Sequence, residues 1–370
     1  MRMIQEELFG RSKWVTPETE GIKYAGSKLK LIPSILEIIS DLDVRTILDG
    51  FSGTTRVSQA FARLGFDVIS NDIAEWSEVF GKCYLLNCYP KSHYKPLIEH
   101  LNSLKGYDGW FTEHYGGEPG KDEKKPFQRK NTRKCDAIRD EIERLNLTNV
   151  EKAVALTSLI LALDAVDNTL GHHVSYLADW SERSYHDLCL KIPMLFISEG
   201  RNEVIKGDIF ETVRQREVDL AYFDPPYGSN NDKMPPSRVR YASYYHIWTS
   251  IVKNDKPKLF GKAKRREDSR DNVASSVFEE FRKDESGKFI AIQAIKKLVE
   301  ETKAKYILLS YSSGGRATKK ELAEILTSSG KILKVMEIGY KQNVMSGMRW
   351  TNEWVNTTEK HCEYLFLLEK

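Results

Sequence analysis

The clearest pattern along the chain is a series of short apolar runs, each of which ends at an acidic residue. Four runs have this form and the length of a buried strand: VRTILDG (44–50), FDVISND (66–72), NEVIKGD (202–208) and VDLAYFD (218–224). Between the first two, TRVSQAFARLG (55–65) has helical spacing, and Gly65 is a typical helix stop. We therefore expect strands that alternate with helices.

The same alternation returns in the last third of the sequence. A helical pattern at 291–303 precedes a strand-like run at 306–312, and two more strand-like runs follow at 332–340 and 363–370. Strands that alternate with helices are typical of an α/β fold with a mostly parallel sheet covered on both faces. Ligands of such sheets bind beyond the carboxyl ends of the strands, where the acids of the first four runs lie.

The segment at 91–199 does not keep this alternation. It is too long for a connection within a compact sheet, and it contains helical patterns at 135–147 and 151–166. We expect an inserted, mainly helical lobe at 91–199 and a sheet domain formed by 1–90 and 200–370. His172 and His173 lie near the end of the lobe; because no other His or Cys stands at ligand spacing, we interpret them as a polar turn.

Composition places the chain among globular proteins of a reducing compartment. Its 370 residues are 41% hydrophobic, which is enough for a substantial core. The five cysteines are scattered and form no C-x-x-C pair, so they suggest neither a disulfide framework nor a zinc cage. The first residues lack the apolar core of a signal peptide, and the most apolar stretch is too short for a bilayer. We expect a soluble cytoplasmic protein without membrane or metal.

The net charge of +3 says little, but the charge is unevenly distributed. Residues 229–275 include eleven Lys or Arg and five Asp or Glu, and residues 121–134 include seven basic and two acidic ones. Such segments suit a polyanion, because each phosphate that they neutralise releases counterions. Two solvated loops would have the same composition, so charge alone leaves both interpretations open.

The loop LDGFSGTT (48–55) has features of a nucleoside-binding turn. Gly50 and Gly53 allow a ligand to approach the backbone, and the next helix can present free amides at its start. The loop is neither a P-loop nor a G-x-G-x-x-G element. Asp72, at the end of the next strand, could accept hydrogen bonds from ribose hydroxyls. This favours adenosine without a diphosphate, although a tight turn needs glycine in any case.

The stretch DLAYFDPPYGSN (219–230) ends a strand with an acid, two prolines and an aromatic ring. Together with FSGTT (51–55), the acid at the end of the second strand and KYAGSK (23–28), it resembles the S-adenosylmethionine-dependent N6-adenine DNA methyltransferases of the D12 (Dam-like) class. The resemblance implies a class I methyltransferase with a Rossmann-like, mostly parallel seven-stranded sheet, and a target-recognition, DNA-binding lobe at 91–199. It also implies double-stranded DNA as partner, no metal, and a flipped-out adenine as substrate.

The resemblance assigns roles to individual residues. The cofactor would contact Tyr24, Lys28, Phe51, Ser52, Gly53, Thr54, Asp72 and Asp208. The carboxylate of Asp224 and the carbonyl of Pro225 would accept the two amino hydrogens of adenine, Pro226 would keep the turn rigid without offering a competing amide hydrogen, and Tyr227 would stack on the base. The family's loop usually carries a second glycine where this chain has Thr54-Thr55. The threonines could crowd the cofactor, or Thr54 could contact it.

For DNA binding, we select residues of the basic and aromatic stretch after the DPPY motif: Arg238, Arg240, Tyr244, Lys262, Arg265 and Arg266. Tyr244, Tyr245 and Trp248 could equally pack a helix onto the sheet. The predicted function is site-specific adenine methylation in a restriction-modification system, with a cognate restriction endonuclease as a possible partner. RNA-adenine or protein-glutamine methylation, or a non-catalytic DNA-binding subunit, are the alternatives.

Overall fold

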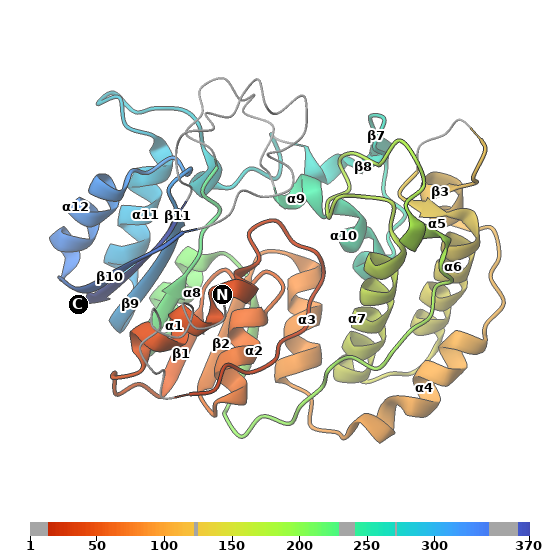
Figure 1. The fold of residues 1–370 in the computed structure, drawn as a ribbon, viewed down its shortest axis with the longest axis horizontal. Helices are drawn as coiled ribbons and strands as arrows, with labels where there is room; N and C mark the ends of the chain where they lie inside the picture. The colour runs from red at the N-terminus through yellow and green to blue at the C-terminus, as the bar shows by residue number, and fades with distance from the viewer. Residues whose placement is uncertain (1–13, 122–124, 229–240, 271, 340–361) are drawn as a thin grey trace, which may run out of the picture.

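The molecule has a half built on a β-sheet and a half built of helices. A computed structural model describes residues 14–121, 125–228, 241–270, 272–339 and 362–370. In Figure 1 the sheet lies on the left, helices α4 to α7 lie on the right, and α3 (Glu75–Leu85) stands between them.

Within the described residues, seven strands form one sheet in the order β10-β11-β9-β6-β1-β2-β5. Strand β11 is antiparallel to both of its neighbours, and the other adjacent pairs are parallel. This confirms the predicted mostly parallel, seven-stranded sheet. The strands are β1 (Thr46–Asp49), β2 (Asp67–Asp72), β5 (Glu203–Lys206), β6 (Glu217–Phe223), β9 (Lys303–Ser312), β10 (Lys331–Gly339) and β11 (Cys362–Glu369).

Alternate residues of the central strands face two hydrophobic cores. In β6, Leu220 and Tyr222 face one core, whereas Ala221 and Phe223 face the other. This is the period of two that a strand imposes, and because both faces are buried the strand sequence is almost continuously apolar. The first core is covered by α1 (Ile32–Ile39) and α2 (Arg56–Arg63), and the second by α8 (Ile209–Gln215), α11 (Ile290–Glu301) and α12 (Lys319–Ser329).

The segment 91–199 is mainly helical, as predicted. It contains α4 (Lys91–Ser103), α5 (Trp110–Tyr115), α6 (Arg129–Arg144), α7 (Asn149–Val166), the 3₁₀ turn η2 (Glu182–Tyr185) and a short ladder of β3 (Gly116–Gly117) and β4 (Phe127–Gln128). A capping box of Thr148 and Glu151 starts α7. The proposed domain boundaries at 90 and 200 stay a prediction.

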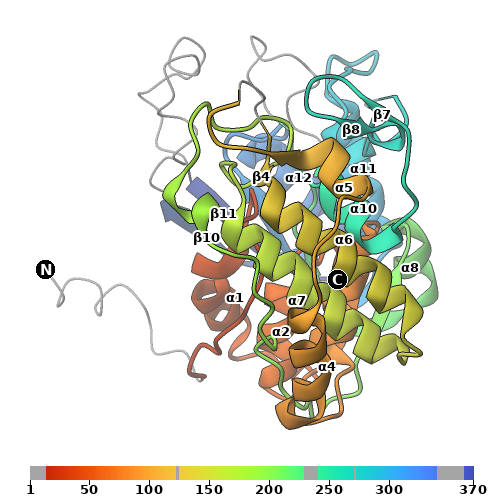
Figure 2. The ribbon, with the colours of Figure 1, turned by 90° about the vertical axis from the view of Figure 1, so that its right-hand side faces the viewer.

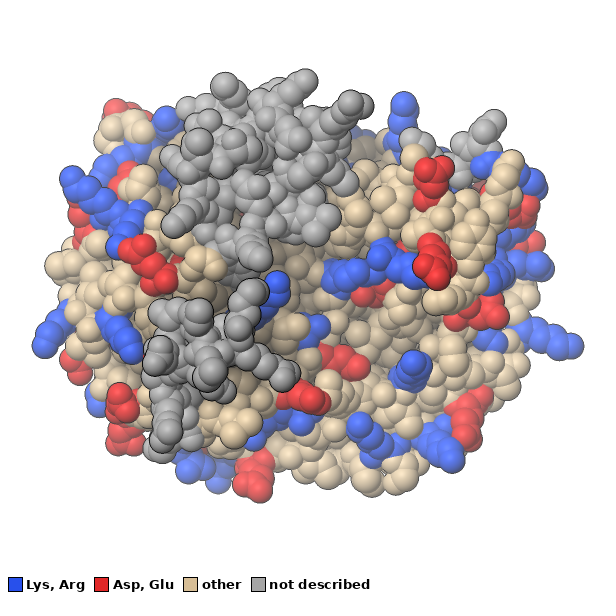
Figure 3. All heavy atoms as spheres, viewed as in Figure 1, with Lys and Arg blue, Asp and Glu red and all other residues tan. Residues whose placement is uncertain are grey.

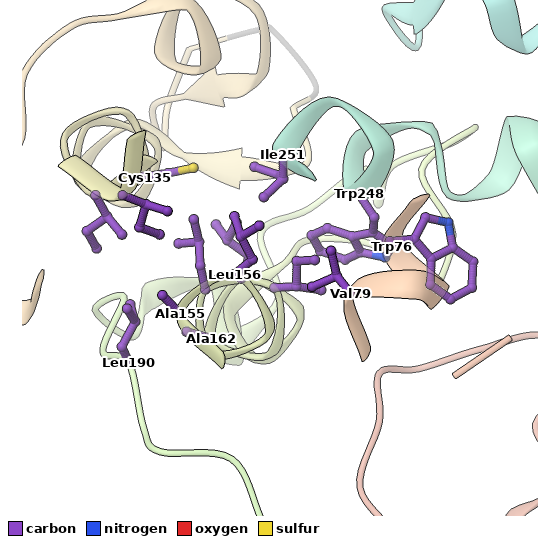
Figure 4. Close-up of a cluster of buried hydrophobic side chains, with 14 of the residues drawn as sticks. Trp76, Val79, Cys135, Ala155, Leu156, Ala162, Leu190, Trp248 and Ile251 are labelled. Atoms are coloured by element: carbon purple, nitrogen blue, oxygen red, sulfur yellow. The ribbon is translucent and has the colours of Figure 1, made fainter. Parts of the chain in front are cut away.

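A third hydrophobic core joins this segment to the sheet half. Figure 4 shows Trp76 and Val79 of α3, Leu156 of α7, and Trp248 and Ile251 of α10 (His246–Lys253) converging in it. Helix α7 is apolar all round because it is buried between α3, α6 and α10. In the described parts of the chain, no helix is long and apolar enough to cross a membrane.

The chain between β6 and α11 forms a cap of small elements. These are α9 (Tyr241–Tyr244), α10, a hairpin of β7 (Leu259–Phe260) and β8 (Arg265–Arg266), and the 3₁₀ turns η4 (Glu267–Ser269) and η5 (Val277–Glu279). The hairpin lies beside α5 (Figure 2), where the hydroxyl of Tyr115 donates a hydrogen bond to the carbonyl of Lys264 at 3.0 Å. The cap therefore connects the DPPY turn to the inserted helices.

Candidate active site

A cavity of about 670 Å³ lies at the carboxyl ends of β1, β2 and β6. Its wall combines the segment before α1, the glycine loop, the ends of β2 and β5, the DPPY turn, and residues from α9 to η5. All the predicted cofactor residues line it: Tyr24, Lys28, Phe51, Ser52, Gly53, Thr54, Asp72 and Asp208. Asp224 and Pro226 face the same cavity, whereas Pro225 and Tyr227 do not line it, so the structure brings the glycine loop and part of the DPPY turn together around one space.

The glycine loop needs its two glycines for close packing. A Cβ on Gly50 would lie 2.6 Å from the ring of Phe223, which is too short for any side chain. Gly53 has a φ of 49°, in the left-handed region that favours glycine, and a Cβ there would lie 3.3 Å from the hydroxyl of Tyr24. The loop can therefore bring its backbone up to the cavity.

Thr55 occupies the position of the family's second glycine, and its φ of 59° is also left-handed. Its side chain does not line the cavity; it is buried and accepts a hydrogen bond from the side-chain amide of Gln59 at 3.1 Å. Thr54, by contrast, lines the cavity wall. The exchange of glycine for Thr55 therefore strains the backbone but does not crowd the cavity.

Asp72 links the glycine loop to the end of β2. Its carboxylate accepts hydrogen bonds from the amides of Gly53 at 2.7 Å and Ala74 at 2.9 Å. Burial raises the pKa of Asp72, and these backbone donors act in the opposite direction. A carboxylate can accept about four hydrogen bonds, and the Ile73 amide is a third backbone donor, so about one remains for a ligand's hydroxyl. Asp208 is different, because it is exposed and caps α8 by accepting a hydrogen bond from the Phe210 amide.

The DPPY turn follows β6 directly. Asp224 retains 16% side-chain exposure at the cavity, whereas Pro225 is buried. Burial raises the pKa of Asp224 to about 7, since the nearby cation of Lys28 offsets only part of the effect and the charge of Glu363 adds to it. The ring of Tyr227 packs against Tyr311 with centroids 5.5 Å apart. The turn is thus neither sealed in the core nor turned away from the glycine loop.

Lys28 lines the cavity and also pairs with two buried acids. The resemblance assigned it to the cofactor, and it does line the cavity, but its ammonium lies 2.9 Å from Asp224 Oδ1 and 3.0 Å from Glu363 Oε1. Burial alone would lower the pKa of Lys28, but Asp224 and Glu363 raise it well above its ordinary value. Lys28 is therefore a cation that neutralises the DPPY acid.

Tyr24 belongs to an aromatic cluster that the sequence did not reveal. It stacks on Tyr245 with centroids 4.7 Å apart and packs beside Tyr241 and Trp76 at 5.4 and 5.7 Å. The hydroxyl of Tyr245 accepts a hydrogen bond from the Ala25 amide at 2.7 Å, so Tyr245 positions the KYAGSK turn. Tyr245 thus takes the packing role that we left open for it.

Two other cavity residues were missed. Asp49 ends β1 in a fully buried position, where Ser58 donates a hydrogen bond to Oδ2 at 2.6 Å; among the described residues, Oδ1 has no hydrogen-bond partner. Burial raises the pKa of Asp49 to about 7. Ile73 is 71% exposed at the cavity, directly after Asp72. The sequence could have indicated both residues. Asp49 is an acid at the end of a predicted strand, and Ile73 directly follows another such acid, Asp72.

The predicted DNA-binding residues separate into three groups. Arg238 and Arg240 lie outside the described residues. Lys262 is exposed at the tip of the β7–β8 hairpin, and Arg265 is half-buried over the ring of Phe260. On the face drawn in Figure 3, basic and acidic side chains are interspersed over both halves of the molecule.

Arg266 and Tyr244 are engaged inside the protein. The guanidinium of Arg266 is 2% exposed and contacts Asp255 at 2.6 Å and Asp268 at 2.7 Å. In this conformation Arg266 holds the hairpin together and offers no donor at the surface for a phosphate. The ring of Tyr244 stacks on His172 at 4.9 Å.

The two histidines of the lobe lie in a turn, as we interpreted them, but this turn is buried. Both are buried, and His173 packs edge-on against Trp248 with centroids 4.6 Å apart. Burial lowers the pKa of His173 to about 3, so it is neutral. In the parts of the chain that the structure describes, no group of three or more His, Cys, Asp or Glu could hold a metal ion.

The sheet, with its one antiparallel strand and a ligand-sized cavity at the strand ends, defines an α/β fold consistent with a class I methyltransferase. Residues 24–312 match the model of the D12 class N6 adenine-specific DNA methyltransferases. Because this match covers most of the chain, the protein belongs to the D12 class N6 adenine-specific DNA methyltransferase family, which confirms the resemblance drawn from the motifs.

Curated relatives agree with this assignment. Over 94% of its length the chain is 27% identical to Modification methylase StsI of Streptococcus sanguinis and 26% identical to Type II methyltransferase M.NlaIII of Neisseria lactamica. It is 25% identical to Type II methyltransferase M.FokI of Planomicrobium okeanokoites, again over 94% of its length. The chain spans about half the length of the StsI and FokI relatives, at 52% and 53%, but 99% of the NlaIII relative.

Proposed function

We propose that this protein transfers the methyl group of S-adenosylmethionine to the N6 atom of a flipped-out adenine in double-stranded DNA, at a specific sequence, as the modification enzyme of a restriction-modification system. The observation that carries the proposal is that Asp224 and Pro226 face the same cavity as the glycine loop. Family membership supports the reaction. The restriction-modification role rests on the names of the relatives, two of which are type II methyltransferases.

The cavity suits S-adenosylmethionine in size and charge. Its volume of about 670 Å³ is within the range of small-molecule sites, and seven acidic residues, among them Asp49, Asp72 and Asp224, line it against four basic ones. The sulfonium and ammonium groups of this cofactor are cations that such a wall attracts, and Asp49 Oδ1 has no hydrogen-bond partner among the described residues. When bound, the cofactor supplies a methyl group already activated by the sulfonium.

The positions of the cofactor residues on the cavity wall support the roles that we propose for them. The backbone of Phe51 to Gly53 approaches the cofactor, Asp72 accepts a hydrogen bond from a ribose hydroxyl, and Ile73 offers an apolar surface to the cofactor's adenine. Thr54 and Asp208 add polar contacts, and Tyr24 borders the methionine end. Lys28 lines the same wall and also pairs with Asp224.

The DPPY turn orients the substrate amino group. The carboxylate of Asp224 accepts one hydrogen of N6 and the carbonyl of Pro225 accepts the other, so that the nitrogen lone pair points towards the methyl group. Pro226 has no amide hydrogen that would compete for these acceptors. Extrusion of the base costs a few kcal/mol of stacking, and a stacking aromatic such as Tyr227 returns about 1 to 3 kcal/mol.

Positioning supplies most of the rate enhancement in this scheme. Well-oriented reactants gain roughly 7 to 11 kcal/mol, and the methyl donor needs no strong base. Asp224 acts as an orienting acceptor, which requires its ionised form, and the proton leaves to solvent after transfer.

DNA would lie across the cap and the inserted helices. Lys262 and Arg265 contact the backbone in this proposal, together with Arg238 and Arg240, while the lobe at 91–199 reads the target sequence. A cognate restriction endonuclease would be encoded alongside this protein and need not bind to it. A reaction on genomic DNA also fits the cytoplasmic location that we expect.

The rival substrates are less well supported. RNA-adenine and protein-glutamine methylation would use the same type of turn, but the family is specific for DNA adenine. A non-catalytic subunit would not need to keep Tyr24, Asp72, Asp208 and Asp224 around one cavity.

The test is methyl transfer in vitro. The purified protein is incubated with S-adenosylmethionine and unmethylated DNA, the DNA is digested, and the nucleosides are examined by mass spectrometry for N6-methyladenine, with RNA and protein as parallel substrates. We expect methylation of DNA alone. In Asp224→Ala, transfer should be abolished while calorimetry finds cofactor affinity within about tenfold of wild type, or about 1.4 kcal/mol. Cofactor binding without transfer to DNA by the wild type would contradict the proposal.

A further inference from the structure

Three buried charged side chains meet behind the DPPY turn. The ammonium of Lys28 lies between Asp224 Oδ1 and Glu363 Oε1, at 2.9 and 3.0 Å, and the three side chains are 7%, 16% and 6% exposed. The hydroxyl of Ser310 donates a hydrogen bond to the same oxygen of Glu363 at 2.8 Å. Glu363 is near the start of β11, outside every motif that points to the reaction, and it does not line the cavity.

This arrangement gives one buried cation two buried anions. A buried ammonium is stable only next to a counter-charge. If Asp224 were its only partner, Asp224 could not turn towards a substrate without leaving Lys28 unpaired. Glu363 removes this conflict, because Lys28 keeps a partner whatever Asp224 does.

The position of Lys28 matters to the substrate in a second way. Its ammonium lies 5.4 Å from the centroid of the Tyr227 ring, which is the ring proposed to stack on the extruded adenine. Lys28 therefore neighbours both the acceptor of the amino group and the stacking surface of the base. A residue that sets the position of Lys28 also sets the geometry of the substrate site.

We propose that Glu363 is a positioning residue for methyl transfer: it shares the charge of Lys28, and thereby frees Asp224 to accept the adenine amino group. This inference rests on the proposed function, since it assigns a role within that reaction. Glu363 touches neither cofactor nor substrate and acts through Lys28.

The charges around Asp224 determine the direction of the pH effect. Besides Lys28 and Glu363, the titratable groups that face Asp224 are Tyr24 from the segment before α1, Asp49 from β1, Tyr222 from β6 and Tyr241 from α9. Burial raises the pKa of Asp224, Lys28 lowers it and Glu363 raises it. Loss of the charge of Glu363 should therefore lower the pKa of Asp224. Without Glu363 as a second partner, Lys28 should also hold Asp224 more tightly.

The experiment compares wild type, Glu363→Gln and a matched control. The control is Glu203→Gln, which removes the charge of a glutamate on the edge strand β5. Glu203 pairs with Arg216 and lies away from the cavity. Single-turnover methyl transfer to unmethylated genomic DNA is measured between pH 5.5 and 9. For Glu363→Gln we expect the acid limb of the profile to move down by roughly one pH unit and the plateau rate to fall about tenfold. Glu203→Gln should keep the wild-type profile, and all three proteins should bind S-adenosylmethionine equally.

A conservative variant covers the case in which Glu363→Gln does not fold. Glu363→Asp retains the charge but withdraws it from Lys28, so its acid limb should lie between those of wild type and Glu363→Gln. A folded Glu363→Gln or Glu363→Asp with the wild-type limb and plateau would overturn the role of Glu363.

Failure of the proposed function looks different. In that case neither wild type nor Asp224→Ala transfers methyl groups to DNA, and the role of Glu363 falls with it. If wild type is active and Asp224→Ala is not, an unchanged profile in the Glu363 variants overturns this inference alone.

Discussion

Buried charges occur both at the strand ends and in the β7–β8 hairpin, which line the same cavity, but they are satisfied to different degrees. In the hairpin, the guanidinium of Arg266 is held by two carboxylates, Asp255 and Asp268, at 2.6 and 2.7 Å. At the strand ends, Asp49 Oδ1 lacks a hydrogen-bond partner among the described residues. Burial alone therefore does not mark a functional charge. A buried charge that faces a cavity and lacks a complete set of partners is the one that is available to a ligand.

We expect the largest effect at Asp49, the buried acid with an incomplete set of hydrogen-bond partners. In Asp49→Asn the buried charge is removed and the hydrogen bond from Ser58 can be kept. The pKa of Asp49 rises on folding from 3.8 to about 7, so the folded state holds more protons than the unfolded state in this window, and wild-type stability falls as the pH rises through it. The variant should lack this loss, which amounts to roughly 1.4 kcal/mol per pH unit.

The same variant should bind the cofactor less tightly. Loss of one charge-assisted contact of roughly 1.5 kcal/mol corresponds to about tenfold weaker binding of S-adenosylmethionine. Denaturant unfolding at pH 5 and 8 and calorimetry measure both effects. A variant that is less stable than wild type at pH 8, and binds the cofactor normally, would show that Asp49 is a structural residue.

The next prediction concerns Arg266, the buried cation that is paired with two carboxylates. Arg266→Met removes the charge but keeps much of the volume, and should destabilise the fold by about 3 kcal/mol, the low end for a buried pair because both carboxylates are partly exposed. Urea unfolding measures this. Lys262→Ala, in the same hairpin but exposed, is the matched control and should change stability by less than about 0.5 kcal/mol.

DNA binding should show the reverse order: Lys262→Ala should change it, whereas Arg266→Met should not. Lys262→Ala should reduce by about one the slope of log affinity against log salt concentration, while folded Arg266→Met keeps the wild-type slope. A reduced slope in Arg266→Met without loss of stability would mean that Arg266 leaves its carboxylates to bind a phosphate.

The smallest effect concerns backbone strain beside the cavity. In Thr55→Gly, relief of a left-handed φ should gain about 1 to 2 kcal/mol, and loss of the hydrogen bond with Gln59 should cost about 1 kcal/mol. The net change should stay within about 1 kcal/mol in thermal unfolding. Since Thr55 does not line the cavity, cofactor affinity should not change. A large loss of affinity would indicate that the threonine shapes the loop for the cofactor.

The sequence predicted the sheet well because strand periodicity is a local property. In β1, β2, β5 and β6 the observed bounds lie inside the predicted runs or within one residue of them. It also predicted that Asp72 and Asp224 would meet at one cavity, because the carboxyl ends of parallel strands share one edge of the sheet. No local sequence pattern shows which partner a charged side chain will have. Nothing in KYAGSK shows that Lys28 contacts Asp224.

By itself, then, the sequence determined the class of fold, the family and the motifs that surround the cavity, since these depend on the spacing of residues close together in the chain. Only the tertiary structure decided which charges are paired. Arg266 became a structural cation and Glu363 a neighbour of the DPPY acid because side chains from distant segments meet in a low-dielectric interior. There the distance between two charges decides whether each is neutralised or available to a ligand.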